Sequence, residues 1–316
     1  MFLLVLLAAA ASATTPPVFV LQWGSAGNGP GQFANPEGIA VSRAGDVYVA
    51  DTENYRVQRF TSTGAFVTAW GSYGTGDDQF GAPFAVAVNQ QGEVYVLDAN
   101  NMRVQKFTAD GQFILKWGSY GALPGQFSAP RGIAVDPEGS VYVLDYYLMR
   151  VQKFSPIGTF LGMWGSSGSG DGQFTLPVSI AVDRAFHVYV ADSRLWRVQK
   201  FTDTGEFLLK WGSYGTGPGQ LAGQISLAVD GFGNVYAASS ARNDVQEFTP
   251  QGEYVLGWGE AGSGPGELQR PVGLGIDDAG GIYVLDNAYY PRVMKYFSPA
   301  TPARPTTWGR IKALYR

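Results

Sequence analysis

The stretch Trp-Gly-Ser-Tyr-Gly-Thr-Gly, residues 70–76, contains the Trp-Gly pair that decides the fold of this chain. The pair recurs every 47 residues, at Trp23, Trp70, Trp117, Trp164, Trp211 and Trp258. A constant period of this size is typical of repeat architectures, in which each unit is too small to bury its own apolar face and must stack on its neighbours. Although 316 residues would ordinarily suggest two domains, the repeat predicts one closed array of six units.

Each unit has the same order of elements, which the first unit illustrates. A Gly-rich loop over residues 25–35 and then Pro36 lead into four short strands, predicted at residues 38–41, 47–51, 56–60 and 66–70. Continuous apolar runs such as Val-Tyr-Val suit strands that are buried on both faces. The hairpin turns carry Gly, for which a positive φ costs little. Six four-stranded antiparallel sheets around one axis make an all-β, six-bladed β-propeller.

The two ends of the repeat array are each incomplete, and together they make one blade. Residues 18–22 look like a fourth strand without its first three, whereas residues 272–297 look like three strands without a fourth. We therefore expect residues 18–22 to pair with 292–297 and to close the ring without leaving open sheet edges. Residues 307–309 are the rival fourth strand, but the prolines before them remove ladder donors and favour a tail.

The chain divides into a leader, the propeller and a tail. Residues 1–13 combine an apolar run with Ala-Ser-Ala, which predicts a signal peptide, with an N-terminal membrane anchor as the alternative. The propeller is expected over 14–298, followed by a basic, Pro-containing tail over 299–316 with four cations and no acid. A solvated tail is the favoured interpretation, and a partner-binding arm is the alternative. These features predict a secreted or cell-envelope protein with no stable membrane span once the signal is cleaved.

The overall charge limits the classes of partner. A net charge of −4 and a pI near 5.1 argue against nucleic acid or anionic lipid, which need a basic surface. The absence of cysteine fits an exported protein stabilised by its core, without identifying a compartment. We expect a monomer.

The repeat resembles the NHL repeat family over about residues 18–297. The matching positions in the first unit are Pro36, residues 38–41, Gly45, residues 47–51, Asn54, residues 56–58 and Phe60. The histidine of the Asn-His-Leu triplet is absent, because Asn54-Tyr55-Arg56 stands there. The resemblance implies a six-bladed propeller that is usually a binding platform. Some members or relatives bind RNA, act as sensors, or are metal-dependent lyases and lactonases.

Aspartates recur at the end of the second strand, and arginines recur at the start of the third. Asp51 is predicted to lie opposite Arg56 across a four-residue loop, and four other units repeat the pair. Recurrence in most blades favours a structural ion pair, and a metal-binding anionic ring is the alternative. The fifth unit breaks the pattern with Ser239 and Asp244.

Candidate metal and catalytic residues are few, so we predict no metal site, no cofactor and no enzyme activity. His187 is the single histidine and is expected in a solvated turn, which argues against zinc chemistry and nucleophilic triads. At the channel mouth Glu37 is the one acid expected, and Arg131 opposes a cation. Residues 77–78 and Asp171 are acids of the loops between blades that could bind calcium. A lyase-like or lactonase-like enzyme with a carboxylate-bound metal remains the alternative function.

Departures from the repeat point to a ligand-binding face. The loops between strands two and three share one face with the Gly-rich loops, and there we predict a ligand-binding set of Tyr73, Tyr120, Tyr146, Tyr147, Trp196, Tyr289 and Tyr290, with Arg131 and Glu37 at the channel mouth. Tyr and Trp offer rigid contact area with a polar tip, which suits protein, peptide or carbohydrate ligands. The alternative is that several of these rings pack inward between blades. The sequence predicts a secreted, non-catalytic binding platform.

Overall fold

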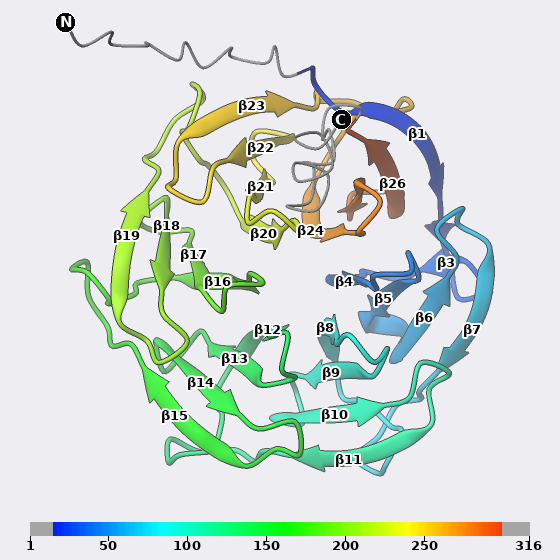
Figure 1. The fold of residues 1–316 in the computed structure, drawn as a ribbon. Coiled ribbons are helices and arrows are strands. Elements are labelled where there is room, and N and C mark those ends of the chain that lie inside the picture. The colour runs from blue at the N-terminus through cyan, green and yellow to red at the C-terminus, as the bar shows by residue number, and fades with distance from the viewer. Residues whose placement is uncertain (1–14, 299–316) are drawn as a thin grey trace, which may run out of the picture.

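The computed structural model describes residues 15–298 as six four-stranded antiparallel sheets arranged around a central channel (Figure 1). In each blade the first strand given below lines the channel, and the others follow it outward. The first three blades comprise β4 (Gly38–Val41), β5 (Val47–Asp51), β6 (Arg56–Phe60) and β7 (Phe66–Trp70); β8 (Pro83–Val88), β9 (Val94–Asp98), β10 (Arg103–Phe107) and β11 (Phe113–Trp117); and β12 (Pro130–Val135), β13 (Val141–Asp145), β14 (Arg150–Phe154) and β15 (Phe160–Trp164).

The last three blades repeat this arrangement. They comprise β16 (Pro177–Val182), β17 (Val188–Asp192), β18 (Arg197–Phe201) and β19 (Phe207–Trp211); β20 (Ile225–Val229), β21 (Val235–Ser239), β22 (Asp244–Phe248) and β23 (Tyr254–Trp258); and β24 (Pro271–Ile276), β25 (Gly281–Asp286), β26 (Arg292–Phe297) and β1 (Val18–Trp23). A short parallel pair, β2 (Ser25–Ala26) with β3 (Gln32–Phe33), lies in the first Gly-rich loop. The described residues include one 3₁₀ turn, η1 (Thr52–Asn54), and no helix long and apolar enough to cross a membrane.

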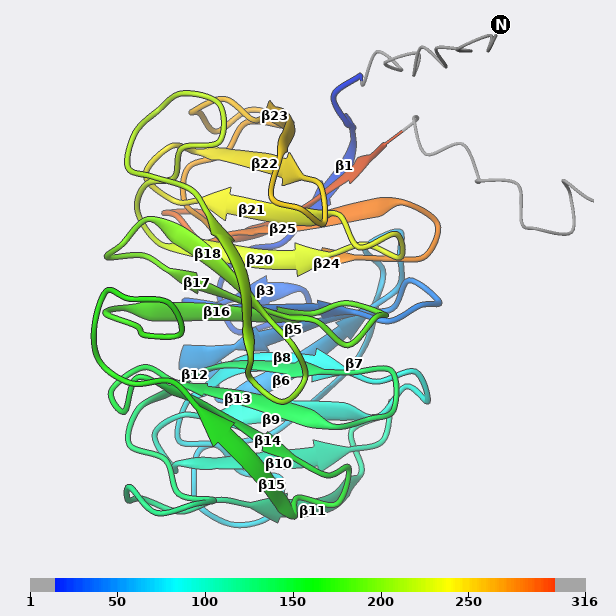
Figure 2. The ribbon, with the colours of Figure 1, turned by 60° about the vertical axis from the view of Figure 1, so that its left-hand side comes forward.

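The ring closes through β1, as the sequence predicts. β1 pairs antiparallel with β26 from Val18 opposite Phe297 to Trp23 opposite Val293, with an irregularity near its start. Figure 2 shows the two strands side by side at the blade where the described chain begins and ends. The rival segment, residues 307–309, the predicted signal at 1–13 and the tail at 299–316 lie outside the described residues.

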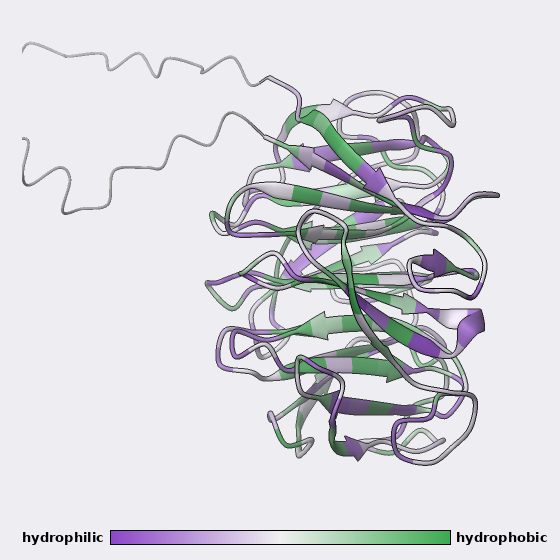
Figure 3. Cartoon of the chain, turned by 90° about the vertical axis from the view of Figure 1, so that its right-hand side faces the viewer, coloured by the Kyte–Doolittle hydropathy of each residue, from purple (hydrophilic) through white to green (hydrophobic). Residues whose placement is uncertain are grey.

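The core consists of layers between neighbouring blades. The second strand of each blade is buried along its whole length. Figure 3 shows apolar stretches within many of the strands. The indole of Trp70 lies against the turn at Gly111 of the next blade, where an added Cβ would come within 2.5 Å of the ring. The same indole approaches Phe107 of that blade at 5.8 Å between ring centroids. The Trp-Gly period therefore records the contact between one blade and the next.

We expect deletion of residues 1–23 to destabilise the protein far more than deletion of residues 1–16. The longer deletion removes β1 and Trp23, and loss of one core aromatic side chain costs about 3–5 kcal/mol by itself. Thermal unfolding of both variants measures the difference. Equal melting temperatures for the two variants would contradict closure by β1.

Candidate ligand-binding face

Buried aspartates fix the loops of one face of the propeller. Asp51 lies opposite Arg56 as predicted, accepts a hydrogen bond from its Nε at 2.8 Å, and also accepts from the backbone N–H of Ala34 at 2.7 Å. Arg56 donates in turn to the carbonyl oxygens of Asn28 and Gly29 in the loop between blades. The ion pair recurs in blades two and six, whereas Arg150 and Arg197 of blades three and four donate only to loop carbonyl oxygens and not to their aspartates. In all five blades the two residues tie the loop between strands two and three to the Gly-rich loop beside it. The recurring acids have a structural role here.

The fifth blade uses a substitute for this tie. Ser239 stands in place of the aspartate, and Arg242 pairs instead with Asp244 at 2.6 Å while donating to the carbonyl oxygens of Gly215 and Gly217. Ser239 Oγ and one oxygen of Asp244 are buried without a hydrogen-bond partner among the described residues. The loop is therefore held by the same kind of contact, made by an arginine two residues earlier in the chain.

The ties bring aromatic residues of adjacent loops into contact. Tyr55 meets Tyr73 with ring centroids 4.9 Å apart, and Trp196 meets Tyr214 at 5.1 Å. Tyr55 and Trp196 occupy equivalent positions with φ values of 55° and 53°, in the left-handed region. Residues other than glycine are uncommon in this conformation. The left-handed backbone persists here because the surrounding loop contacts fix it.

Most of the predicted aromatic residues lie separately on the surface. Those that are 65% exposed or more are Tyr73, Tyr120, Tyr147, Tyr289 and Tyr290. Tyr289 and Tyr290 contact one another at 5.6 Å in the loop between β25 and β26. The described structure does not gather these five rings into one cavity.

Three of the predicted residues do converge. Arg131 at the start of β12, Tyr146 in the loop after β13 and Trp196 in the loop after β17 line one pocket of about 280 Å³. Its remaining wall is formed by Leu176, Val178, Ser193, Gly223 and Gln224, so the pocket spans blades three, four and five beside the channel mouth. Trp196 is half-buried and packs against the core cluster beneath it, while Tyr214 covers it from the side. Both sequence interpretations of Trp196, surface contact and packing between blades, describe part of its surroundings.

Arg131 has an unusual environment for a half-buried cation. Its guanidinium carbon lies 5.0 Å from the ring centroid of Tyr146 and 5.4 Å from that of Phe84. Among residues 15–298 it has neither a salt bridge nor a hydrogen-bond acceptor. Glu37, the other predicted residue at the mouth, lies 4.0 Å from Arg270 instead. Burial raises the pKa of Glu37, and the charges of Arg270 and Arg131 oppose that shift.

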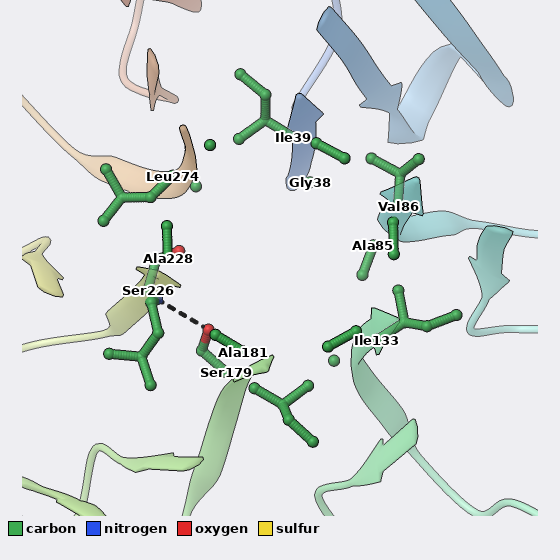
Figure 4. A pocket seen from close by; sticks show the side chains of 18 of the residues that line it. Gly38, Ile39, Ala85, Val86, Ile133, Ser179, Ala181, Ser226, Ala228 and Leu274 are labelled. Carbon is green, nitrogen blue, oxygen red and sulfur yellow. Dashed lines mark hydrogen bonds between the residues drawn. The ribbon is translucent and has the colours of Figure 1, made fainter. Parts of the chain in front are cut away.

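The side chains that line the channel beside this pocket are mostly apolar. Its cavity of about 230 Å³ is lined by the innermost strands of all six blades. Figure 4 shows Ile39, Val86 and Ile133 around it, with Ser179 close to the neighbouring strand β20. The Ser179 hydroxyl oxygen accepts the backbone N–H of Leu227 at 3.0 Å, so this polar group joins two blades.

The opposite mouth contains a set of polar residues that the sequence interpretation missed. The positions are 47 residues apart and hold Ser42, Asn89, Asp136, Asp183, Asp230 and Asp277, all buried. Asp183 accepts the Tyr189 hydroxyl at 2.9 Å and also contacts His187 Nδ1 at 2.8 Å. His187 lies in the predicted turn, where its side chain is 33% exposed and hydrogen-bonded to Asp183, so it is only partly solvated. The constant spacing was the signal that could have revealed this set.

Two of the three loop acids that could have bound calcium are paired with other groups, whereas Asp78 forms no ion pair among the described residues. Asp77 forms an ion pair with Lys116, and Asp171 forms one with Lys210. Residues 15–298 contain no group of three or more His, Asp or Glu side chains arranged to hold a metal ion.

Cations of the third strands connect neighbouring blades on this opposite side. Lys200 lies over the Tyr189 ring at 5.2 Å and donates to the carbonyl oxygen of Pro250 in the next blade at 3.0 Å. The equivalent residues Arg59, Lys106 and Lys295 make the corresponding contacts. Lys153 lies over the Tyr142 ring in the same way but donates to the Asp203 carboxylate of the next blade. The fifth blade has Glu247 at this position. In the other blades the cation reaches the turn between strands three and four of the next blade. Blade six has no such turn, because its third and fourth strands, β26 and β1, come from opposite ends of the described chain.

Glu247 therefore lies in a setting that disfavours its charge. Burial is the main cause, and the nearby Asp230 is the second, of a pKa raised from 4.5 to about 7. The folded protein consequently retains this proton between pH 4.5 and about 7, whereas the unfolded chain releases it.

Comparison with known proteins agrees with the repeat pattern. NHL repeat sequences match residues 33–60, 80–107 and 127–154. A segment of 47 residues is 43% identical to part of the B-box type zinc finger protein ncl-1 of Caenorhabditis elegans. The matched segment makes up 15% of this chain and 6% of that protein's length.

Similar solved structures share the fold. A Bacteroides thetaiotaomicron protein of unknown function has a TM-score of 0.68 at 19% identity, covering 88% of this chain and 76% of its own. A streptogramin B lyase has a TM-score of 0.59 at 15% identity, covering 84% and 94%. A gluconolactonase from Xanthomonas campestris has a TM-score of 0.59 at 14% identity, covering 90% and 99%. At these identities the likeness concerns architecture alone.

We expect Glu247→Gln to remove a pH-dependent loss of stability. In the natural protein the contribution of Glu247 is fully present below pH 4.5 and is lost as pH rises to about 7. After allowance for solvent screening, the variant should exceed the natural protein by on the order of 2 kcal/mol at pH 8, with little difference at pH 4. Denaturant unfolding across this pH range measures the effect, and Glu253→Gln, at an exposed acid of the same blade, is the control. A variant with the natural pH profile would show that Glu247 does not titrate in this way.

We expect EDTA to leave the melting temperature unchanged. A calcium ion bound to the folded state alone, at a free concentration well above its Kd, would stabilise the protein by roughly 3–4 kcal/mol. Calorimetry with and without the chelator measures this, with magnesium-saturated EDTA as the control. A large drop on chelation, reversed by calcium, would favour the enzyme alternative.

Proposed function

Because the chain is a six-bladed propeller built of NHL repeats, we propose that it is a non-catalytic binding platform for a protein, peptide or carbohydrate ligand. The observation that carries this proposal is the convergence of Arg131, Tyr146 and Trp196 in one pocket beside the channel mouth. Arg131 and Tyr146 come from blade three and Trp196 from blade four, and each departs from what the equivalent blades carry. Departures that meet at one place are better explained by a shared ligand than by a repeated structural requirement.

The pocket has the physical character of a recognition site. Trp196 and Tyr146 present flat surfaces that are already held in place, since the backbone of the Trp196 loop is fixed by hydrogen bonds to Asp192. Rigid aromatic surfaces lose little conformational entropy on binding and often dominate the energy of an interface. Ser193 and Gln224 add polar groups at the wall. The exposed tyrosines outside the pocket would extend the contact of a larger ligand.

Export of the protein is part of this proposal. It is supported by the apolar run and the Ala-Ser-Ala sequence within residues 1–13, which lie outside the described structure. An exported binding platform with an acidic net charge suits ligands other than nucleic acid.

Screening the purified protein against a peptide phage library and a glycan array tests the proposal, with the affinity of each hit measured by calorimetry. Trp196→Ala and Tyr146→Ala should weaken binding by about 2 kcal/mol, or roughly 30-fold. Phe232→Ala, at an exposed aromatic residue near the opposite mouth, is the matched control and should bind as the natural protein does. Melting temperatures separate lost contact from lost folding, because Trp196 also packs on the core.

Two results would contradict the proposal. One is the absence of any hit in either library. The other is a hit whose affinity is unaffected by both pocket variants while the melting temperatures stay close to that of the natural protein.

A further inference from the structure

We propose that this pocket binds a carboxylate attached to an apolar or aromatic group, with Arg131 as the carboxylate-binding residue. The inference rests on the proposed function and specifies the chemistry of its ligand. It begins from Arg131, a half-buried arginine of this face that has neither an ion pair nor a hydrogen-bond acceptor among the described residues.

The other arginines of the face show what compensation looks like in this protein. Arg103 donates to Asp98 at 3.0 Å and to three loop carbonyl oxygens at 2.7 to 2.9 Å. Arg242 has Asp244, and Arg270 has Glu37 nearby. A partly desolvated cation without an acceptor is costly, so its N–H groups favour an anionic ligand that restores the missing bonds.

The surroundings of Arg131 hold it ready for such a ligand. Tyr146 and Phe84 lie near the guanidinium carbon at 5.0 and 5.4 Å, which stabilises the cation through the ring faces without supplying hydrogen-bond acceptors. A guanidinium presents five N–H donors in a fixed plane that matches the two oxygens of a carboxylate. The aromatic contacts therefore position the charge, and the donors remain for the ligand.

The rest of the pocket selects what the carboxylate is attached to. Leu176, Val178 and Trp196 give apolar wall, and the cavity of about 280 Å³ accommodates one amino-acid-sized group. The Ser193 hydroxyl oxygen already accepts the backbone N–H of Ile225 at 3.1 Å, which leaves its proton for an acceptor on the ligand. A free aromatic acid and the C-terminal residue of a peptide both carry this chemistry.

Matched acid and amide probes test the inference by calorimetry. For the free acid the pair is N-acetyl-tryptophan and N-acetyl-tryptophanamide. For the peptide the pair is Gly-Ser-Gly-Ser-Trp with a free C-terminus and with a C-terminal amide. The natural protein should prefer the acid by roughly 10-fold or more in at least one pair, because charge-assisted hydrogen bonds to the amide are lost. Preference in both pairs, or in one only, identifies the source of the carboxylate.

Variants assign the preference to Arg131. Arg131→Gln should bind acid and amide equally, and Arg131→Lys should keep part of the preference as a point charge. Arg194→Gln removes an exposed charge from the neighbouring loop outside the pocket and should keep the full preference. Melting temperatures of all variants exclude unfolding as the cause.

Several outcomes would overturn the inference. They are equal binding of acid and amide by the natural protein, a preference retained in Arg131→Gln, and no binding of either acid at millimolar concentration. If both members of a pair bind equally and Trp196→Ala weakens both, the carboxylate inference fails while the proposed binding function stands. If the affinity of the library hits is the same for the pocket variants as for the natural protein, the proposed function fails as well.

Discussion

The contact between a tryptophan of one blade and a glycine turn of the next is the constraint on which the ring depends. Trp117 fits over Gly158, and a Cβ at that glycine would lie 2.7 Å from the indole. The indole Nε1 atoms of all six Trp-Gly tryptophans are buried without an acceptor among the described residues. These tryptophans therefore contribute shape and apolar area, which must outweigh the cost of an unpaired N–H. Five of the six seams use a glycine turn in this way, whereas Trp258, before blade six, packs against Tyr296 of β26 at 6.2 Å between ring centroids.

The features that recur with the 47-residue period could be predicted from the sequence. The strand bounds of the first blade, the closing pair of β1 and β26, and the Asp51 to Arg56 pair follow from the period and from hairpin geometry. The positions of Tyr147 and Tyr289 at separate loop tips do not, because a loop tip is placed by local contacts that the period does not encode. Arg131 was visible as a charge at the mouth, but its two aromatic neighbours come from different blades. Their approach depends on the radius of the ring.

Function is expected where the sixfold pattern is broken. Most blades carry the same ties, so a residue that differs is free of the structural requirement. Arg131 and Trp196 are such departures and lie at one pocket. Glu247 and Ser239 are also departures, but both lie in the fifth blade, next to the blade that two chain segments complete. These two departures reflect the missing turn of blade six and the changed position of the arginine in blade five rather than a ligand.

The pairing of β1 with β26 also makes this protein suitable for circular permutation. Because both ends of the described chain meet in one blade, joining them by a short linker would give a backbone without ends. A new opening could then be cut at the turn near Gly64, which connects the two outer strands of the first blade. Such a circular permutant would carry its fusion points on a different blade while the pocket stayed intact. The fold thus offers a choice of attachment sites around its rim, each facing a different direction from the binding face.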